Sequence, residues 1–88
     1  MTSWSGREAQ TLTRLTLETY GTVCHLCGGP GATTADHVIP RKHGGLNVLA
    51  NLRPAHRSCN SARGAMLLAE WFATRRYAAA VVPPSRQW

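Results

Sequence analysis

Two pairs of potential metal ligands share the same spacing, with two residues between their members. The first pair, Cys24 and Cys27, lies in CHLC and is followed by two glycines. Two thiolates at this spacing can hold one tetrahedral ion, and the glycines let the chain fold back so that backbone N–H groups face the sulfurs. The second pair is His56 and Cys59, in HRSC. Together they form a Cys3His set, a common composition for structural zinc.

The alternative for CHLC is a redox motif, which usually opens a helix after a strand in a longer βαβ fold. The second pair and the small size of the chain favour zinc. His56 has an alternative of its own, as an exposed basic residue with another group in the fourth ligand position. His25, between the two cysteines, is expected to be an exposed turn residue, with a phosphate contact as the alternative, rather than a ligand.

Asp36 and His37, in TADHVIP, form an adjacent pair with complementary chemistry. A neutral imidazole can accept a proton from water, and a carboxylate oxygen suits a hard divalent ion such as Mg²⁺. Because adjacent residues of a regular strand point to opposite faces, we expect the two side chains to have separate roles. Taken alone, the pair also fits a surface site in which Asp36 only orients His37. His43, in RKHGG, is a rival base.

The composition indicates a polyanionic partner. Ten Lys and Arg oppose four Asp and Glu, which gives a formal net charge of +6, and nine of the ten basic residues are Arg. Arg makes planar, bidentate contacts with phosphate, so we expect a nucleic acid partner, with simple solubility as the alternative. No apolar run resembles a signal peptide or a membrane span, and three Cys do not suit a disulfide framework. We therefore expect a cytoplasmic protein without a membrane partner.

The length of 88 residues predicts a single domain, 1–88, whose small core needs a metal or another constraint. The expected elements are a helix at about 7–20, the CHLC turn, a strand at 33–39, a glycine-containing loop, a strand at 52–55, a short helix from about 56, a helix at about 65–80 and a tail at 83–88.

Local signals set the expected boundaries of these elements. Ser5 and Glu8 suggest a capping box for the first helix, which Gly21 ends. Pro54 confines the second strand to an edge or an end of the sheet. Gly64 divides the two later helices. In the last helix, the spacing of apolar residues predicts a buried face that consists of Ala65, Leu67, Leu68, Ala69, Trp71 and Phe72.

The motifs CHLC, DHVIP, GG, NL and HRSCNSARG follow one another in this order. In order and spacing they resemble the HNH endonuclease family, in the subset that carries a structural zinc. The resemblance covers about residues 24–64 and extends loosely into the following helix. It implies an α+β fold with a small, treble-clef-like ββα-metal core, a zinc knuckle and flanking helices. The two metal-ligand pairs match the zinc positions of the family.

The resemblance also implies roles for four residues. His37 is similar to the general base that activates water, and Asp36 to a ligand of a catalytic divalent ion, Mg²⁺ or Mn²⁺. Asn51 resembles the middle residue of the family name, which holds the loop and orients the His. Asn60 takes the place of the last residue, as another ligand of that ion. The alternatives are a loop residue that bonds its own backbone for Asn51 and a helix cap for Asn60.

Three positions depart from the usual family pattern. Asn60 stands where His is usual, which bears on metal preference and turnover. His56 stands where Cys is usual, which bears on zinc affinity. Arg63 stands where Lys is common and keeps the positive charge.

The implied activity is metal-dependent DNA nicking or cleavage that leaves 3′-hydroxyl and 5′-phosphate ends, with little sequence preference. Domains of this kind resemble those of bacteriophages, so phage packaging proteins are implied partners. The expected DNA contacts are Arg41, Lys42, His43, Arg53, Arg57 and Arg63. Arg75 and Arg76 either offset the dipole of the last helix or contact phosphate. A non-catalytic zinc module that binds DNA or protein, and an accessory subunit of a larger machine, are the alternative functions.

Overall fold

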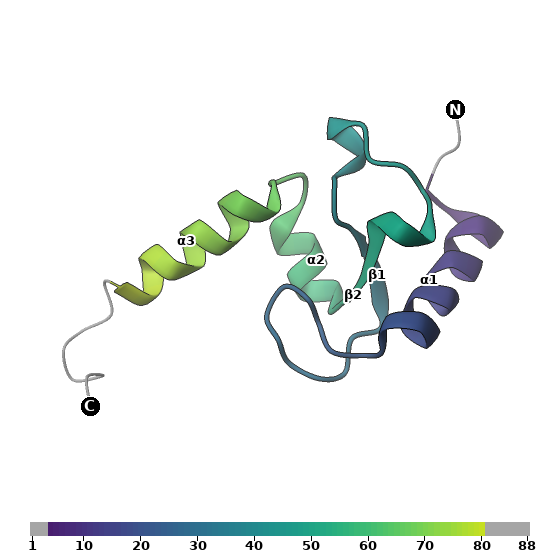
Figure 1. Cartoon of the computed structure of the whole chain (residues 1–88), viewed down its shortest axis with the longest axis horizontal. Helices are drawn as coiled ribbons and strands as arrows, with labels where there is room; N and C mark the ends of the chain where they lie inside the picture. The colour runs from purple at the N-terminus through teal and green to yellow at the C-terminus, as the bar shows by residue number, and fades with distance from the viewer. Residues whose placement is uncertain (1–3, 81–88) are drawn as a thin grey trace.

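The computed structural model describes the backbone of residues 4–80 and the side chains of residues 4–75. The fold is α+β, and its elements follow the predicted order (Figure 1). They are α1 (Gly6–Tyr20), β1 (Thr34–His37), the short 3-10 helices η1 (Arg41–His43) and η2 (Leu49–Asn51), β2 (Leu52–Ala55), α2 (Arg57–Arg63) and α3 (Leu68–Ala80). The strand β1 is shorter than the predicted 33–39, and α3 begins at Leu68 rather than near residue 65.

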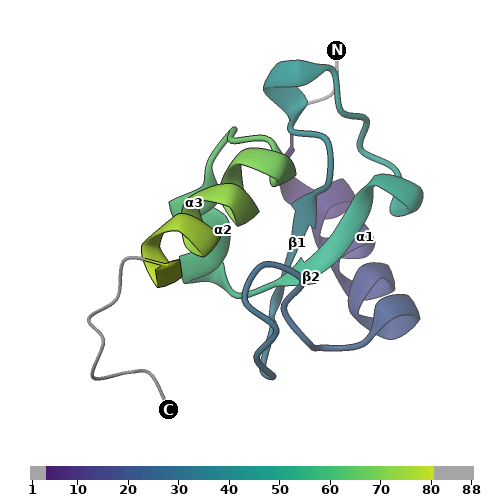
Figure 2. The same cartoon turned by 60° about the vertical axis from the view of Figure 1, so that its left-hand side comes forward.

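The sheet consists of two antiparallel strands, which pair from Thr34 with Ala55 to His37 with Leu52. The strands lie between α1 and α2 (Figures 1 and 2). The helix α1 packs against both strands, and α2 packs against β1. The end of β1 therefore faces a helix on each side, which places Asp36 and His37 in the interior.

The helix α1 begins and ends close to the predicted positions. Ser5 is the N-cap residue, but its side chain makes no capping hydrogen bond, so the predicted capping box with Glu8 is wrong. Gly21 ends the helix at φ +88°, a conformation that favours glycine. Thr16 is fully buried, and its hydroxyl donates to the Leu12 carbonyl at 2.6 Å. This bond allows a polar side chain to face the sheet without leaving its hydroxyl unsatisfied.

The apolar core is small and lies beside the cysteines. Its buried members are Cys24, Leu26, Ala32, Ala55 and Trp71. The Trp71 indole donates to the Leu26 carbonyl at 3.0 Å, which ties α3 to the CHLC turn. The predicted face of α3 is only partly right: Leu68, Trp71 and Phe72 pack on the core, whereas Ala65, Leu67 and Ala69 are exposed.

Pro54 lies within β2, as predicted, and its carbonyl accepts a hydrogen bond from the His25 backbone N–H at 2.9 Å. The CHLC turn therefore covers the outer edge of β2. None of the described helices is long and apolar enough to cross a membrane. The side chain of Arg76, the stop at Pro83–Pro84 and the tail at 83–88 lie outside the described residues.

Candidate functional site

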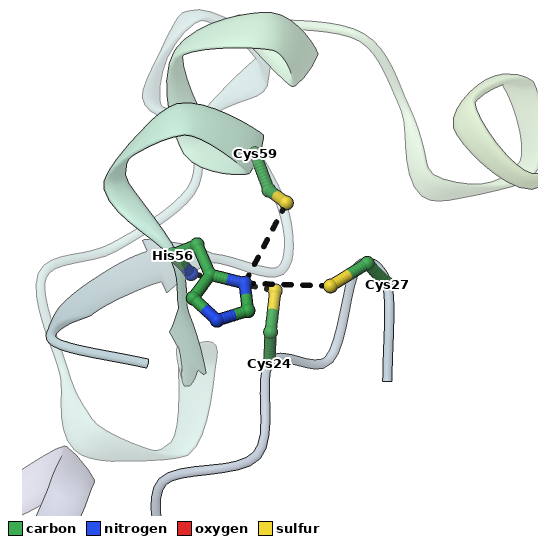
Figure 3. Close-up of side chains that lie close together, drawn as sticks. All are labelled: Cys24, Cys27, His56 and Cys59. Carbon is green, nitrogen blue, oxygen red and sulfur yellow. Dashed lines mark hydrogen bonds between the residues drawn. The ribbon is translucent and has the colours of Figure 1, made fainter. Parts of the chain in front are cut away.

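Cys24, Cys27, His56 and Cys59 form one cluster, as the sequence predicts (Figure 3). One potential ligand atom from each residue lies within 4.8 Å of all the others. The His56 Nδ1 lies 3.3 Å from the Cys27 sulfur and 3.8 Å from the Cys59 sulfur. A tetrahedral zinc with ordinary bond lengths separates its ligand atoms by about 3.5–3.8 Å. The donor set and the spacing fit zinc.

We call Cys24, Cys27, His56 and Cys59, with the turns that carry them, the zinc knuckle. Neighbouring backbone groups hold these four side chains in place. The Gly29 N–H donates to the Cys27 sulfur, and the His56 N–H to the Cys24 sulfur, each at 3.4 Å. The His56 Nε2 donates to the Pro30 carbonyl at 2.7 Å, because a carbonyl can only accept. This bond leaves Nδ1 as the nitrogen with a lone pair, which is the atom that faces the sulfurs.

Burial and hydrogen bonds shift the pKa values of two thiols in the zinc knuckle in opposite directions. Burial raises the pKa of Cys24, but hydrogen bonds from the backbone of His56, Leu26 and Cys27 outweigh it and lower this pKa to about 6. Burial and the neighbouring thiols raise the pKa of Cys59 to about 11. The hydrogen bond to Pro30 raises the pKa of His56. In the metal-free protein, Cys24 is thus a thiolate more readily than Cys59.

His25 is not the exposed turn residue that the sequence predicts. Its side chain is only 17% exposed, and its Nε2 lies 2.8 Å from the Asp36 Oδ2. The backbone of the CHLC turn directs the His25 imidazole toward the sheet, where it contacts the Asp36 carboxylate. No local feature of the sequence distinguishes such a residue from a solvent-facing one.

A pocket of about 220 Å³ is lined by Asp36, His37 and Asn60, three of the four residues to which the resemblance assigns roles in catalysis; Asn51 does not line it. Arg41 and Lys42 also line this pocket. Asp36 and His37 are 4% and 8% exposed, so they lie at its base rather than at the surface. We call it the Asp36 pocket. Its lining residues include one acidic residue, one histidine and two basic residues, and its volume is too small for a large ligand.

Arg63 is buried beneath the Asp36 pocket, and this corrects its predicted contact with DNA. Its side chain is 0% exposed. The guanidinium donates to Asp36 Oδ2 at 2.5 Å and to the carbonyls of His37, Val38 and Met66 at 2.6, 2.8 and 2.7 Å. These bonds join α2 to the end of β1. A phosphate outside the protein cannot reach a side chain enclosed in this way.

His37 is held by two neighbours that the sequence reasoning missed. Its Nε2 donates to the Asn47 Oδ1 at 2.8 Å, because an amide oxygen can only accept. The Trp4 ring packs edge-on against the imidazole, with the ring centroids 4.7 Å apart. The bond to Asn47 fixes the tautomer that carries its proton on Nε2, and Nδ1 keeps the lone pair. Asn47 follows the double glycine in a loop, where nothing marks it out from Asn51.

Asn51 bonds the loop that carries η1, rather than His37. Its side chain accepts from the Ile39 N–H at 2.9 Å and donates to the carbonyls of Ile39 and Leu46 at 3.1 and 3.0 Å. Gly45 packs against the same segment, where an added Cβ would fall 1.7 Å from the Ile39 carbonyl oxygen. Asn51 thus fixes the start and the end of the loop in one arrangement.

Asn60 lies within α2, so the alternative of a helix cap is wrong. Its Nδ2 lies 3.4 Å from the Thr34 hydroxyl and 3.3 Å from the Ala35 carbonyl. Both bonds engage the nitrogen of the amide, and both partners of Asp36 engage Oδ2. Within the described residues, neither the Oδ1 of Asn60 nor the Oδ1 of Asp36 is therefore assigned a hydrogen bond.

The other predicted DNA contacts differ in their surroundings. Arg41, Lys42, His43 and Arg57 are exposed, and the His43 Nε2 lies 3.1 Å from the Ala65 carbonyl. The Arg53 guanidinium lies 4.1 Å from the centre of the Tyr20 ring and donates to two nearby carbonyls. Arg53 is half-buried, in contrast to these four exposed side chains.

A scan against protein-family models identifies the HNH endonuclease model over residues 24–65. The matched segment runs from the first cysteine of the zinc knuckle to the turn that follows α2. It includes Asp36, His37, Asn60 and all four residues of the metal-ligand cluster. No curated protein and no solved structure matches the chain.

Proposed function

Residues 24–65 belong to the HNH endonuclease family, and from this premise we propose that the protein is a metal-dependent DNA endonuclease. The Asp36 pocket is the observation that supports this proposal most strongly. Asp36, His37 and Asn60 all line this one small cavity, together with Arg41 and Lys42. The proposed reaction is hydrolysis of a phosphodiester bond.

His37 is the proposed general base. The bond from Nε2 to Asn47 leaves Nδ1 with the lone pair that accepts a proton from water. The Trp4 ring restricts rotation of the imidazole on one side. A base whose orientation is fixed before substrate binds loses little freedom in the reaction.

Asp36 and Asn60 are the proposed ligands of a divalent ion, Mg²⁺ or Mn²⁺. Their Oδ1 atoms are hard oxygen donors, the type that these ions prefer. When bound, such an ion stabilises the negative charge that develops on phosphate oxygens. Two protein ligands are few, but Mg²⁺ commonly keeps several waters and takes its remaining ligands from a phosphate.

The charges around the pocket favour a phosphate as the partner. The buried guanidinium of Arg63 offsets the charge of Asp36, and Arg41 and Lys42 add two more positive charges. The pocket as a whole is therefore cationic, and it attracts a phosphate before it attracts a free cation. We expect the protein to bind the divalent ion weakly alone and more tightly with DNA.

The test is nicking of supercoiled plasmid by the zinc-loaded protein, with Mg²⁺, Mn²⁺ or EDTA. His37→Ala is expected to lower the rate by about 100-fold or more, the usual contribution of a general base. Asp36→Ala is expected to abolish the response to the divalent ion. His43→Ala, which removes the rival base, is expected to retain most of the activity. A folded, zinc-loaded His37→Ala protein as active as the parent would exclude this mechanism.

The same assay addresses the products and the specificity. We propose 3′-hydroxyl and 5′-phosphate ends, as the resemblance to the family implies, and little sequence preference. Ligation of the nicked plasmid without end repair tests the ends. Discrete bands from a long DNA would contradict the weak preference.

A non-catalytic zinc module is the second candidate, and one observation favours it. Arg63 and His25 already engage Asp36 Oδ2, as a purely structural carboxylate would require. Such a module would shift DNA in a gel with no nicking under any metal. The same result would suit an accessory subunit that needs a partner.

A further inference from the structure

The bond between His25 and Asp36 joins the zinc knuckle to the Asp36 pocket. His25 lies between the two cysteines of CHLC, and its imidazole reaches the buried carboxylate at 2.8 Å. Asp36 lies on β1, in the other half of the site. One side chain thus spans from the structural metal cluster to the carboxylate of the pocket.

The position of His25 depends on the zinc knuckle. Its backbone N–H donates to the Pro54 carbonyl at 2.9 Å. On either side of it, the Cys24 N–H donates to the Gly29 carbonyl, and the Gly28 N–H to the Cys24 carbonyl, each at 2.8 Å. These bonds close the turn around the thiolates. A zinc ion held by Cys24 and Cys27 would lock the residue that lies between them.

The orientation of the Asp36 carboxylate depends on His25 in turn. Arg63 approaches Oδ2 from α2, and His25 approaches the same oxygen from the zinc knuckle. With two donors on Oδ2, the carboxylate cannot rotate without breaking both bonds, so Oδ1 keeps one direction. With Arg63 alone, the carboxylate can turn about a single contact.

We propose that His25 is a positioning residue that makes the divalent-ion ligand Asp36 depend on the zinc knuckle. The inference rests on the proposed function, because it assumes a divalent ion at Asp36 and Asn60. Hydrogen bonds from outside the ligand shell orient metal ligands, and their loss commonly lowers metal affinity by about 10–100-fold. The affinity of the zinc knuckle for zinc and the affinity of Asp36 and Asn60 for the divalent ion are then linked, and the linkage is reciprocal.

The test compares three substitutions at one position in the full zinc-loaded chain. His25→Gln carries an amide N–H at nearly the place of Nε2 and should preserve the bond. His25→Leu has no donor, and His25→Asn has a donor that is too short to reach Asp36. Val23→Ala, at an exposed position of the same turn, is the matched control.

Two measurements follow the divalent ion in these proteins, and zinc content is determined for each. Mn²⁺ is titrated without DNA while paramagnetic broadening of the Asn60 side-chain amide is recorded by NMR. The Mn²⁺ concentration for half-maximal plasmid nicking is measured separately. We expect the Mn²⁺ concentrations for half-maximal broadening and for half-maximal nicking to rise by about tenfold in His25→Leu and His25→Asn. Both concentrations should stay near the parent values in His25→Gln and Val23→Ala.

The outcomes separate this inference from the proposed function. If the parent binds Mn²⁺ and nicks DNA but zinc-loaded His25→Leu and His25→Asn give the same titrations, the positioning role is wrong and the nuclease stands. The positioning role is equally wrong if His25→Gln is as impaired as His25→Leu. If Mn²⁺ neither broadens Asn60 nor supports nicking in the parent, the proposed function fails, and the inference fails with it.

Discussion

The zinc knuckle and the Asp36 pocket are adjacent, yet they are built in different ways. The knuckle takes its ligands from two short segments, Cys24 with Cys27 and His56 with Cys59, and each pair has a fixed local spacing. The pocket depends on contacts between residues far apart in the chain, such as Asp36 with Arg63. A local site can be identified from spacing alone, whereas a site built from distant partners requires the fold.

The difference also concerns what each region needs from the rest of the protein. A bound zinc would hold the knuckle together even with few other contacts. The Asp36 pocket has no such centre in the protein itself, so its geometry comes from hydrogen bonds donated by neighbouring elements. We therefore expect loss of zinc to affect the whole fold, and changes at the pocket to have graded effects.

Removal of zinc is expected to have the largest effect. Structural zinc contributes on the order of 10 kcal/mol to small domains, and the apolar core here is small. Chelation, or Cys24→Ser, should abolish the cooperative thermal transition seen by circular dichroism. The zinc content of the purified protein provides the reference. A metal-free protein that still unfolds cooperatively would show that the core suffices without the knuckle.

Arg63→Met is expected to have the next largest effect. It removes the buried partner of Asp36 and leaves three carbonyl groups without a donor, a change that typically costs about 3–5 kcal/mol. Chemical denaturation of the zinc-loaded protein measures it. Arg63→Lys keeps the charge but not the fork of donors, so an intermediate loss is expected. A loss below about 1 kcal/mol would mean that the pocket does not depend on Arg63.

The zinc affinity is expected to rise with pH. Zinc binds the thiolate, and the pKa of Cys59 lies at about 11 without metal, so binding displaces at least its proton throughout the neutral range. Cys24, with a pKa of about 6, adds a further proton only below that pH. Competition titrations should show at least about a tenfold gain per pH unit near neutrality and a steeper dependence below pH 6. A flat profile would contradict these acidities.

Asn47→Ala is expected to have the smallest effect. It removes one hydrogen bond to the His37 imidazole, worth about 1 kcal/mol, which corresponds to about a fivefold loss in nicking rate. Nitrogen NMR shifts should show His37 protonated on Nε2 in the parent and a mixture of tautomers in the variant. A parent protonated on Nδ1 would overturn the assignment of the basic nitrogen.

Much of the fold could be predicted from the sequence. Short-range residue patterns were enough to predict the strand at 52–55, the break at Gly64 and the α+β order of the elements. The capping box failed because the Ser5 side chain makes no capping hydrogen bond, although the residue types were right. Such errors follow when a motif records residue types but not side-chain directions.

The candidate site was predictable as a set of residues but not as a network. The spacing indicated the zinc ligands, and the resemblance indicated Asp36, His37 and Asn60. It could not show that Arg63 turns inward, since a basic residue at the end of a helix usually faces solvent. Nor could it show that the imidazole of His25 reaches Asp36, because that contact depends on how the CHLC turn meets the sheet.

Pro54 has a consequence for the behaviour of the protein in concentrated solution. In an antiparallel strand, the N–H and C=O of one residue lie on the same side. Since the Pro54 carbonyl meets the His25 N–H beyond the sheet, the ring nitrogen also lies on that outer side and offers no donor. A second molecule that approached this edge would find one acceptor occupied and one donor missing. The sheet is thereby protected here against pairing with another chain, a common route to aggregation.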